Sequence, residues 1–421
     1  MLNIGTERRG DVTNRKLLII ATLDTKGKET AFVRECAEGS GVGTVLMDVG
    51  TLDPPQVKPD ITRHDLASAA GSDLGDFLAA KDRSGAIQTV QVGGAVVARK
   101  LVEQGEVQGV LGLGGGTGTA IAAHIMRALP FGIPKVIVST VASRDVREFV
   151  GTKDIVMFHS VADLLGFNGF IKRILAQAAG AAVGMMERTI GLSSERPMVA
   201  VSAYGINSAC AMHAEPLLAE RGYDMIGFHA NGMGGMAMEE LISEGIVAGV
   251  LDLTPHEIAD DMFGGYCRGI GPMRLETAGS MGIPFVFAPG GLDNAVFSPY
   301  YPMPKELEGR RIHGHDIRFC VRMEAPEMER FARIVADKLN KAKAGGVRVL
   351  IPTRGWSEAD REGAALFDPA VDRVFTERLK QLLDGRIPVE EMDLHISDPP
   401  FAARAVEVLD DMIRMRAKRD M

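Results

Sequence analysis

The chain alternates between short, continuously apolar runs and longer segments whose apolar residues recur at helical spacing. Runs that are apolar throughout, rather than at every second position, indicate strands of parallel sheets that helices cover on both faces. The sequence therefore predicts an α/β fold built from doubly wound parallel sheets. The predicted strands lie near residues 16–22, 44–49, 108–113, 135–140, 154–158, 197–203, 224–228, 247–252, 284–288, 347–351 and 389–394.

The two halves of the chain resemble each other weakly, which indicates an internal duplication. In each half an apolar strand leads through a polar turn into a helix, a second strand and a turn that ends in glycine. The second half carries an insertion at about residues 254–281. The matching pairs of segments are 16–50 with 197–232, 95–113 with 236–253, and 132–140 with 282–290.

The repeat and the chain length together predict two Rossmann-like domains. At 421 residues the chain exceeds the size of one ordinary hydrophobic core. We expect an N-terminal domain over residues 1–190 and a C-terminal domain over residues 191–421. The boundary is placed in residues 191–197, after a long helical stretch at residues 161–188.

A glycine-rich turn joins the predicted strand at 108–113 to the helical pattern that follows it. Glycines let backbone N–H groups approach an oxyanion, and a helix N-terminus adds unpaired donors and partial positive charge. The turn matches neither the Walker A pattern nor G-x-G-x-x-G, and it resembles the phosphate loop of tubulin-type GTPases. The alternative is a tight turn packed on itself, and we favour the phosphate site. Its residues are Gly114, Gly115, Gly116, Thr117, Gly118 and Thr119.

Two neighbouring turns offer side chains to the same phosphate. Lys26 follows the first predicted strand, where its ammonium group would pair with a phosphate, and Asp24 and Thr25 precede it. Thr140 follows the strand at 135–140. The alternatives are a surface lysine, helix capping by Asp24 or Thr25 and a plain loop. Because ligands of open α/β sheets bind outside the carboxyl ends of the strands, we expect these residues at one nucleotide site.

Turns of the second half are candidates for binding a substrate. Each follows a predicted strand or lies in the insertion, and each offers glycine amides, a carboxamide or a guanidinium group. The turn at residues 231–236 would bind a second anion or only permit a positive φ. The candidate residues are Asn231, Gly232, Arg268, Gly290, Gly291 and Arg354.

The insertion also holds His256 and Asp260, which would share one face of a helix at a spacing of four residues. With Asp252 they would bind a metal or relay a proton. Such spacings are common by chance, and we expect these side chains to form no metal site. We expect Thr254 to cap the helix, and Asp260 and Asp261 to be solvated.

Composition narrows the classes of function. The formal net charge of −8 argues against a nucleic-acid-binding surface, and no apolar run reaches the ~18 residues of a membrane span. The N-terminal residues lack the apolar core of a secretory signal. We expect reduced thiols, no structural zinc site and a cytoplasmic location, because the cysteines lie far apart without a C-x-x-C pair. They are Cys36, Cys210, Cys267 and Cys320.

The motifs taken together resemble those of one family. In order along residues 15–412, the chain carries ATLDTKGKE, GLGGGTGTAIA, VSAYGINSACAMHA, HANGMGGMAMEELI, LDLTPHEIADDMFGG, FAPGGLDN and DLHISDPPFA. This set resembles the Tm-1-like ATP-binding family. The resemblance implies a pair of Rossmann-like subdomains, ATP rather than GTP as the nucleotide, and a homodimer. It implies no particular catalytic residue.

The sequence therefore predicts an ATP-binding protein, with Mg²⁺ held through the phosphate oxygens of the nucleotide. We expect an ATP-dependent enzyme that acts on a small anionic metabolite in a cleft between the domains, by phosphoryl transfer or by activation of an acid. The alternative is a non-catalytic module that binds a nucleotide, a small ligand or a partner protein. Neither a nucleic acid nor a membrane is an expected partner.

Overall fold

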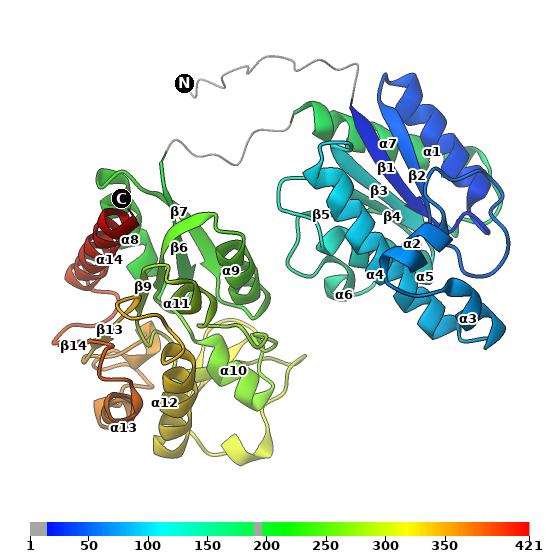
Figure 1. Ribbon diagram of the computed structural model, residues 1–421. Helices are drawn as coiled ribbons and strands as arrows, with labels where there is room; N and C mark the ends of the chain where they lie inside the picture. The colour runs from blue at the N-terminus through cyan, green and yellow to red at the C-terminus, as the bar shows by residue number, and fades with distance from the viewer. Residues whose placement is uncertain (1–14, 189–195, 421) are drawn as a thin grey trace. The chain divides into compact units, whose positions relative to one another are not determined.

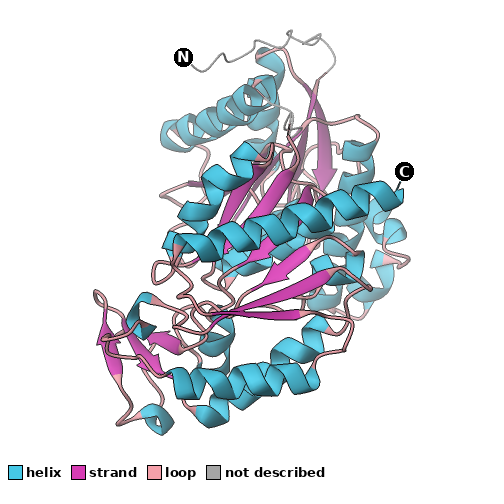
Figure 2. Ribbon diagram, turned by 90° about the vertical axis from the view of Figure 1, so that its left-hand side faces the viewer, coloured by secondary structure: helices cyan, strands magenta, loops and turns pink. Residues whose placement is uncertain are grey.

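The chain forms two compact α/β units, Met1–Leu192 and Ser193–Met421, each of which is described by itself (Figure 1). The structure, a computed structural model, describes residues 15–188 and 196–420. Most of the predicted boundary at 191–197 therefore lies outside the described residues. Strands run between layers of helices in both units, as predicted for doubly wound α/β domains (Figure 2).

The N-terminal unit contains a sheet of five parallel strands in the order β2-β1-β3-β4-β5. Every predicted strand of this half is confirmed. The continuous apolar runs arise because β3 is buried at every position and β1 at every position after the first. The strands are β1 (Lys16–Ala21), β2 (Gly43–Asp48), β3 (Gly109–Gly114), β4 (Lys135–Ser139) and β5 (Ile155–His159).

Helices cover both faces of this sheet. They are α1 (Gly27–Gly39), α2 (Arg63–Ala69), α3 (Leu74–Ala79), α4 (Arg83–Glu103), α5 (Gly116–Arg127), α6 (Arg147–Val150) and α7 (Gly169–Glu187). Successive residues of β1 point to opposite faces. Leu17 and Ile19 join one core with α1 and α7, whereas Leu18 and Ile20 join another with α2, α4 and α5.

Helix α7 begins later than the sequence predicts. The helical pattern starts at residue 161, but Val161 has a φ of 63° and the helix begins at Gly169. The side chain of Asn168 accepts hydrogen bonds from the backbone N–H groups of Phe170 and Ile171, which fixes the helix start there.

The C-terminal unit contains six parallel strands in the order β14-β13-β9-β8-β6-β7. All six strands predicted for this half are confirmed. They are β6 (Met198–Ala203), β7 (Asp224–His229), β8 (Val247–Asp252), β9 (Phe285–Phe287), β13 (Val347–Pro352) and β14 (Val389–Met392). Read from β7, this order repeats that of the N-terminal unit and adds one strand, as expected for a duplicated unit.

Helices also cover both faces of the second sheet. They are α8 (Ser208–Glu220), α9 (Met233–Ser243), α10 (Glu257–Phe263), α11 (Thr277–Met281), α12 (Ala325–Leu339), α13 (Pro369–Leu382) and α14 (Pro399–Asp420). Val199 and Val201 of β6 pack with α8 and α14, whereas Ala200 belongs to the core formed with α9, α11, α12 and α13.

A small antiparallel sheet, which the sequence did not predict, lies between β9 and β13 in the chain. Its order is β10-β12-β11. It comprises β10 (Asn294–Phe297), β11 (Ile312–Gly314) and β12 (Phe319–Arg322). These strands are only three or four residues long, so they give little periodic signal.

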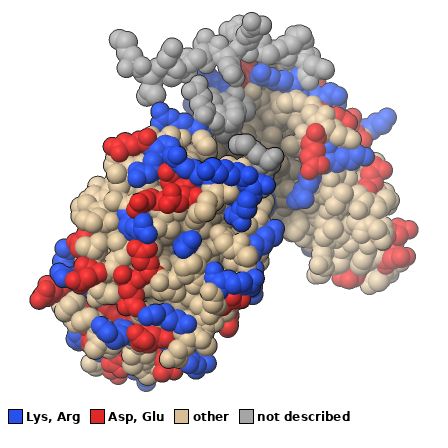
Figure 3. All heavy atoms as spheres, turned by 60° about the vertical axis from the view of Figure 1, so that its left-hand side comes forward, with Lys and Arg blue, Asp and Glu red and all other residues tan. Residues whose placement is uncertain are grey.

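Across residues 15–188 and 196–420, no helix is both long and apolar enough to cross a membrane. On the face drawn in Figure 3, basic and acidic side chains are interspersed rather than gathered by sign. Exposed ion pairs such as that of Arg404 with Glu390, 3.0 Å apart, are consistent with this mixing.

Candidate functional sites

The carboxyl ends of the strands in the N-terminal unit meet at one edge of the sheet. The chain passes from β1 outward to β2 and then returns to the other side of β1, so the strand order reverses between β1 and β3. Ligands of doubly wound sheets bind at such a switch point. The turn at residues 22–26 follows β1 and the glycine turn at 114–118 follows β3. Two of the predicted turns therefore flank the switch point.

The glycines of this turn play two different structural roles. A Cβ at Gly114 would lie 2.7 Å from the Cα of Gly118, so Gly114 permits the close approach of strand and helix. A Cβ at Gly116 would meet no atom within 4 Å, and one at Gly115 would lie 3.7 Å from Thr140 Oγ1. Gly115 is the N-cap residue of α5 and has no side chain to cap it. At Gly116, the start of α5 therefore faces open space.

Hydroxyl groups hold the glycine turn against β4. Thr119 Oγ1 lies 2.8 Å from Ser139 Oγ, and both residues are fully buried. The backbone N–H of Thr140 donates to Gly114 O at 3.3 Å. Thr117 and Thr140 are half-buried, so their hydroxyls are accessible to a ligand while that of Thr119 is engaged in the fold.

The turn after β1 places its three predicted residues differently. Thr25 is exposed, with Oγ1 2.9 Å from Thr22 Oγ1. The ammonium group of Lys26 donates to the backbone carbonyl of Leu164, which leaves two of its three N–H donors. Asp24 is buried and accepts a hydrogen bond from the N–H of Leu52. Asp24 therefore faces the turn after β2, and its nucleotide role stays a prediction.

In the C-terminal unit, the predicted anion-binding turn after β7 holds an internal carboxylate. The N–H groups of Gly232 and Gly235 donate to Glu257 Oε1 at 3.0 and 3.2 Å. Asn231 accepts from the N–H of Gly234 at 2.9 Å. Gly232 has a φ of 86°, and a Cβ there would lie 2.4 Å from Arg268 O. The proposed substrate donors of this turn are thus already engaged.

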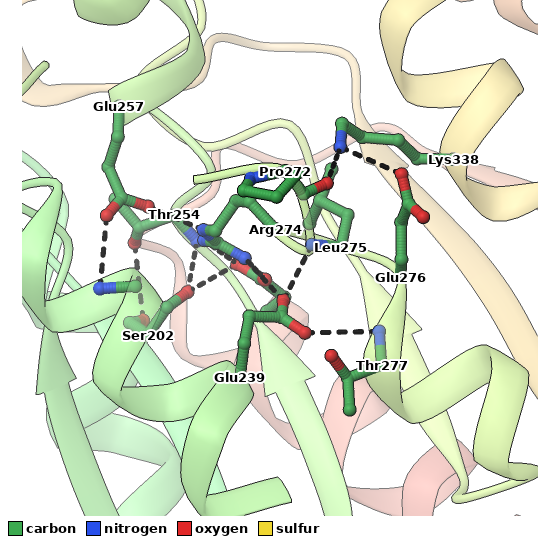
Figure 4. Close-up of polar contacts among 12 residues, drawn as sticks. Ser202, Glu239, Thr254, Glu257, Pro272, Arg274, Leu275, Glu276, Thr277 and Lys338 are labelled. Atoms are coloured by element: carbon green, nitrogen blue, oxygen red, sulfur yellow. Dashed lines mark hydrogen bonds and ion pairs between the residues drawn. The ribbon is translucent and has the colours of Figure 1, made fainter. Parts of the chain in front are cut away.

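Glu257 belongs to a buried network around Arg274 (Figure 4). Arg274 is fully buried and lies 2.7 Å from Glu257 through Nε. It also pairs with Asp252, and Glu239 lies 3.7 Å from Nη1. Burial raises the pKa of Glu257 and of Glu239, while the charge of Arg274 opposes the rise. Three carboxyl groups share one guanidinium, which is therefore engaged inside the fold.

The remaining substrate candidates lie in three different settings. Arg268 is exposed, and its guanidinium lies 4.3 Å from the ring centroid of Tyr301. Arg354 pairs with Asp393 at the surface, 2.7 Å apart. A Cβ at Gly290 would lie 2.0 Å from Leu253 O, and one at Gly291 would lie 2.6 Å from His256 Cβ. The two glycines therefore let the turn after β9 lie against the segment after β8.

Three buried side chains after β8 form a compact cluster that we call the His256 cluster: His256, Asp260 and Cys267. The atoms of these side chains that could bind a metal lie within 4.8 Å of one another. His256 is the N-cap residue of α10 and Asp260 lies within the helix, and the two side chains lie close together as their spacing predicts. Asp260, however, is fully buried rather than solvated, because its two oxygens accept the N–H groups of Val296 and Cys267 at 2.7 and 2.6 Å.

The prediction that Thr254 caps α10 is also wrong. The hydroxyl of Thr254 lies 3.0 Å from Asn207 Oδ1, and the N-cap residue of α10 is His256, without a side-chain hydrogen bond to the helix. Asp261 is exposed, as predicted. The segment after β8 is therefore held by contacts to the turn after β6, across the switch point of this sheet.

The ring of His256 has no hydrogen-bond partner among the described residues, and both of its nitrogens are buried. The backbone of Gly291 and of Asn294 lies close enough to the ring to favour its protonated form, although neither contact has the geometry of a full hydrogen bond. Burial lowers the pKa of His256 to about 3 and raises that of Asp260 to about 7. Burial also raises the pKa of the Cys267 thiol.

A small pocket adjoins the His256 cluster through Tyr204. The Tyr204 ring stacks on that of His256 with centroids 4.4 Å apart, and its hydroxyl lies 3.3 Å from Arg318 Nη1. The hydroxyl is also close enough to the Cys267 thiol that each affects the pKa of the other. The pocket has a volume of about 70 Å³ and is lined by Tyr204, Gly205, Ile206, His229, Val296, His315, Arg318 and Cys320.

A second buried group of charges surrounds Arg322 of β12. Its guanidinium lies 3.2 Å from Asp360 and 2.5 Å from Asp372. Burial raises the pKa of both Asp360 and Asp372, and the charge of Asp293 contributes to both shifts. Asp293 also accepts a hydrogen bond from Ser357 at 2.8 Å. This group ties the small sheet to the segments after β9 and β13.

Comparison with known proteins places the whole chain in one family. Residues 15–190 match the Uncharacterised protein family (UPF0261) N-terminal domain, and residues 196–413 match the C-terminal domain of the same family. The chain belongs to the UPF0261 family. A UPF0261 protein of Clostridium tetani (strain Massachusetts / E88) is 37% identical over 403 residues, covering 95% of this chain and 99% of the relative.

The relation to the Tm-1 proteins is also confirmed. The ToMV resistance protein Tm-1(GCR237) of Solanum lycopersicum is 33% identical over 423 residues, which cover 93% of this UPF0261 chain and 55% of the tomato protein. Among solved structures, the S. aureus MnaA-UDP co-structure covers 88% of this chain and 93% of its own, at 10% identity and a TM-score of 0.22. A TM-score this low supports no argument about this UPF0261 chain.

The sequence predicts the switch-point turns of this UPF0261 chain, and it offers Arg274 as an anion-binding candidate and Cys267 as a polar group of the insertion. It gives no sign that both side chains are buried, or that Tyr204 lies beside Cys267. The available signal was the run from His256 to Cys267, where a histidine, a carboxylate and a thiol follow one strand within a short segment. The spacing of the three residues matches no known metal-binding motif. Their burial depends on loops that cover them, and the sequence pattern does not predict those loops.

Proposed function

We propose that the chain binds ATP, accompanied by Mg²⁺, at the switch point of the N-terminal unit, and that it uses this ATP to act on a small anionic metabolite. The observation that carries the proposal is the glycine turn between β3 and α5. It lies where doubly wound sheets bind ligands, and the start of α5 is uncapped by a side chain and faces open space at Gly116. A phosphate group fits such a helix N-terminus.

Side chains near the turn support a phosphorylated ligand. Lys26 keeps free N–H donors, and the hydroxyls of Thr25, Thr117 and Thr140 are not fully buried. The Tm-1-like resemblance favours ATP over GTP. Phosphate oxygens and water would hold the Mg²⁺ ion. Asp24 keeps one carboxylate oxygen, Oδ1, without a hydrogen-bond partner in the described part of the chain, while its other oxygen lies 3.9 Å from Arg63.

The reaction that we propose is ATP-driven phosphoryl transfer to the metabolite, or activation of the metabolite as an acid. Because the turn after β7 engages its amides with Glu257, we assign the metabolite no residues there. The resemblance also implies a homodimer, which sedimentation of the purified chain would measure.

The test is a calorimetric titration of the purified chain with ATP and with GTP, each with and without Mg²⁺, followed by analysis of the nucleotide after incubation with small carboxylic acids. Binding of ATP in preference to GTP, with ADP or AMP formed in the presence of an acid, is the expected result. Binding without turnover would favour a non-catalytic binding module. No binding of either nucleotide would overturn the proposal.

Gly116→Asp is the sharpest variant, because the added side chain has room and an aspartate suits the first turn of a helix. It would place negative charge where the phosphate binds, which costs several kcal/mol and weakens ATP binding by at least about a hundredfold. Gly169→Asp is the matched control: Gly169 is also the first residue of a helix, α7, and a Cβ there meets no atom within 4 Å. If Gly116→Asp kept the ATP affinity of the wild type, the phosphate would not bind at this turn.

A further inference from the structure

The His256 cluster combines three side chains that bind metals in proteins: an imidazole, a carboxylate and a thiol. They come from one short segment of chain at the carboxyl edge of β8. Strand β8 lies beside the switch point of the second sheet, between β6 and β9. The cluster therefore occupies the place that the glycine turn occupies in the N-terminal unit, although its residues suit a different ligand.

The strongest indication is the unpartnered ring of His256. The side chain is fully buried, and neither ring nitrogen makes a hydrogen bond of full geometry to a described residue, with only the backbone of Gly291 and Asn294 nearby. Buried polar groups in proteins are nearly always paired, and an exception calls for an explanation such as a missing ion. The ring is one of the three groups whose ligand atoms lie within 4.8 Å of one another.

Charge balance supports the same conclusion. A divalent cation bound by one thiolate and one carboxylate, with a neutral imidazole, gives a site with no net charge, which suits complete burial. The two oxygens of Asp260 are held by the N–H groups of Val296 and Cys267. Such support of a ligating carboxylate by backbone donors fixes its orientation.

We infer that His256, Asp260 and Cys267 bind one divalent transition metal of the zinc class. A thiolate and an imidazole favour zinc or a similarly soft metal over magnesium or calcium, so this ion differs from the Mg²⁺ that accompanies ATP. Three protein ligands leave a fourth position of a tetrahedral site for water or a substrate oxygen. Tyr204 stacks on His256 and also lines the small pocket, so it is the residue through which the metal site would adjoin that pocket.

The test uses the full chain, stripped with a chelator and then titrated with Co²⁺ and afterwards with Zn²⁺, in the absence of nucleotide. One equivalent of Co²⁺ should bind and give the intense thiolate-to-cobalt absorption of a cysteine-ligated ion, and Zn²⁺ should displace it. In weak buffer, binding should release protons, because the thiol is protonated before the metal binds. A folded wild-type chain that gives no thiolate-to-cobalt absorption would overturn the inference without any variant.

Two cysteine variants locate the site. Cys267→Ser should lose the thiolate-to-cobalt absorption and bind Zn²⁺ at least about a hundredfold more weakly, because even groups that only support metal ligands change affinity by about 10–100-fold. Cys210→Ser is the matched control, since Cys210 is also fully buried but lies in α8 outside the cluster. Absorption retained in folded Cys267→Ser would overturn the assignment, as would its loss in folded Cys210→Ser. Because no nucleotide is present, the result is independent of the ATP proposal.

Discussion

Arg274 and Glu257 lie 2.7 Å apart, Nε to Oε2, and neither side chain is exposed to solvent. The same carboxylate accepts the backbone N–H groups at the start of α9. Arg274 therefore holds in place the group that caps α9, and it links α9, α10 and the end of β8 into one buried unit.

Replacing Arg274 with methionine should destabilise the C-terminal unit strongly. The variant leaves Asp252, Glu239 and Glu257 buried without their shared cation, and breaking a buried ion pair in this way costs about 3–5 kcal/mol. Chemical denaturation of the two proteins measures the difference. The matched control is Arg268→Met, which removes an exposed arginine and its contact with Tyr301, worth about 0.5–1 kcal/mol. Equal losses in the two variants would show that the network around Arg274 contributes little.

Lys26 should matter for nucleotide affinity more than its neighbour on the same turn. Lys26→Met removes a hydrogen bond to a charged group, worth about 1.5–3 kcal/mol, so ATP should bind about 10- to 100-fold more weakly. Lys28 is exposed and lies in the first turn of α1, so Lys28→Met should bind ATP nearly as the wild type does. Calorimetry measures the ATP affinity of both variants. Equal affinities would show that Lys26 does not bind the nucleotide and only donates a hydrogen bond to the carbonyl of Leu164.

Gly290 should prove structurally necessary whether or not a ligand binds near it. In Gly290→Ala the added Cβ would lie 2.0 Å from Leu253 O, and overpacking of a buried site typically costs about 1–3 kcal/mol. Gly180→Ala, in the middle of α7 where a Cβ meets nothing within 4 Å, should instead stabilise the chain by up to about 1 kcal/mol. Thermal unfolding compares them. A Gly290→Ala protein as stable as the wild type would mean that the turn after β9 can move away from β8.

The buried carboxyl groups around Arg322 should make stability depend on pH. Burial raises the pKa of Asp360 far above its ordinary value of 3.8, and the nearby carboxylates of Asp293 and Asp372 add to the rise. The folded chain therefore retains a proton that the unfolded chain releases, so this contribution to stability is complete below about pH 4 and is lost as the pH rises through the raised pKa. The slope is at most about 1.4 kcal/mol per pH unit for one proton.

Asp360→Asn removes this titration, so its free energy of unfolding should fall less steeply than that of the wild type between pH 5 and pH 9. Denaturation in urea at a series of pH values measures both slopes. Asp145→Asn, which changes an exposed carboxylate paired with Arg147, is the control and should keep the wild-type slope over this range. Parallel curves for Asp360→Asn and the wild type would show that Asp360 is already ionised in the folded state.

The strands were predictable because their signal is local and repeated. β1, β3 and β4 are buried along nearly their whole length, and only continuous apolar runs satisfy that burial. The glycine turn after β3 was predictable for the same reason, since strand, glycines and helix follow one another in the chain. The late start of α7 was not, because Asn168 and the positive φ of Val161 override a helical pattern that continues through them.

The buried polar sites could not be predicted to the same depth. The sequence indicates that Glu257 is an ordinary acidic residue in the first turn of a helix. In the structure its carboxylate accepts a hydrogen bond from the turn after β7. Asp260 reads as a solvated charge, and it is buried because loops after β9 and within the insertion close over it. The sequence identifies such polar residues, but their contacts depend on loop conformations that the sequence pattern does not predict.

The sheet orders also constrain how the chain can fold during synthesis. All five strands of the first sheet come from one continuous stretch, Lys16–His159, so that sheet can be complete before the first strand of the second sheet leaves the ribosome. In the second sheet, β9 pairs with β13, and the small antiparallel sheet and α12 lie between them in the chain. Until β13 emerges, β9 presents an open edge to its surroundings. The nascent C-terminal unit therefore exposes the edge of β9 to other chains until the ribosome has completed β13.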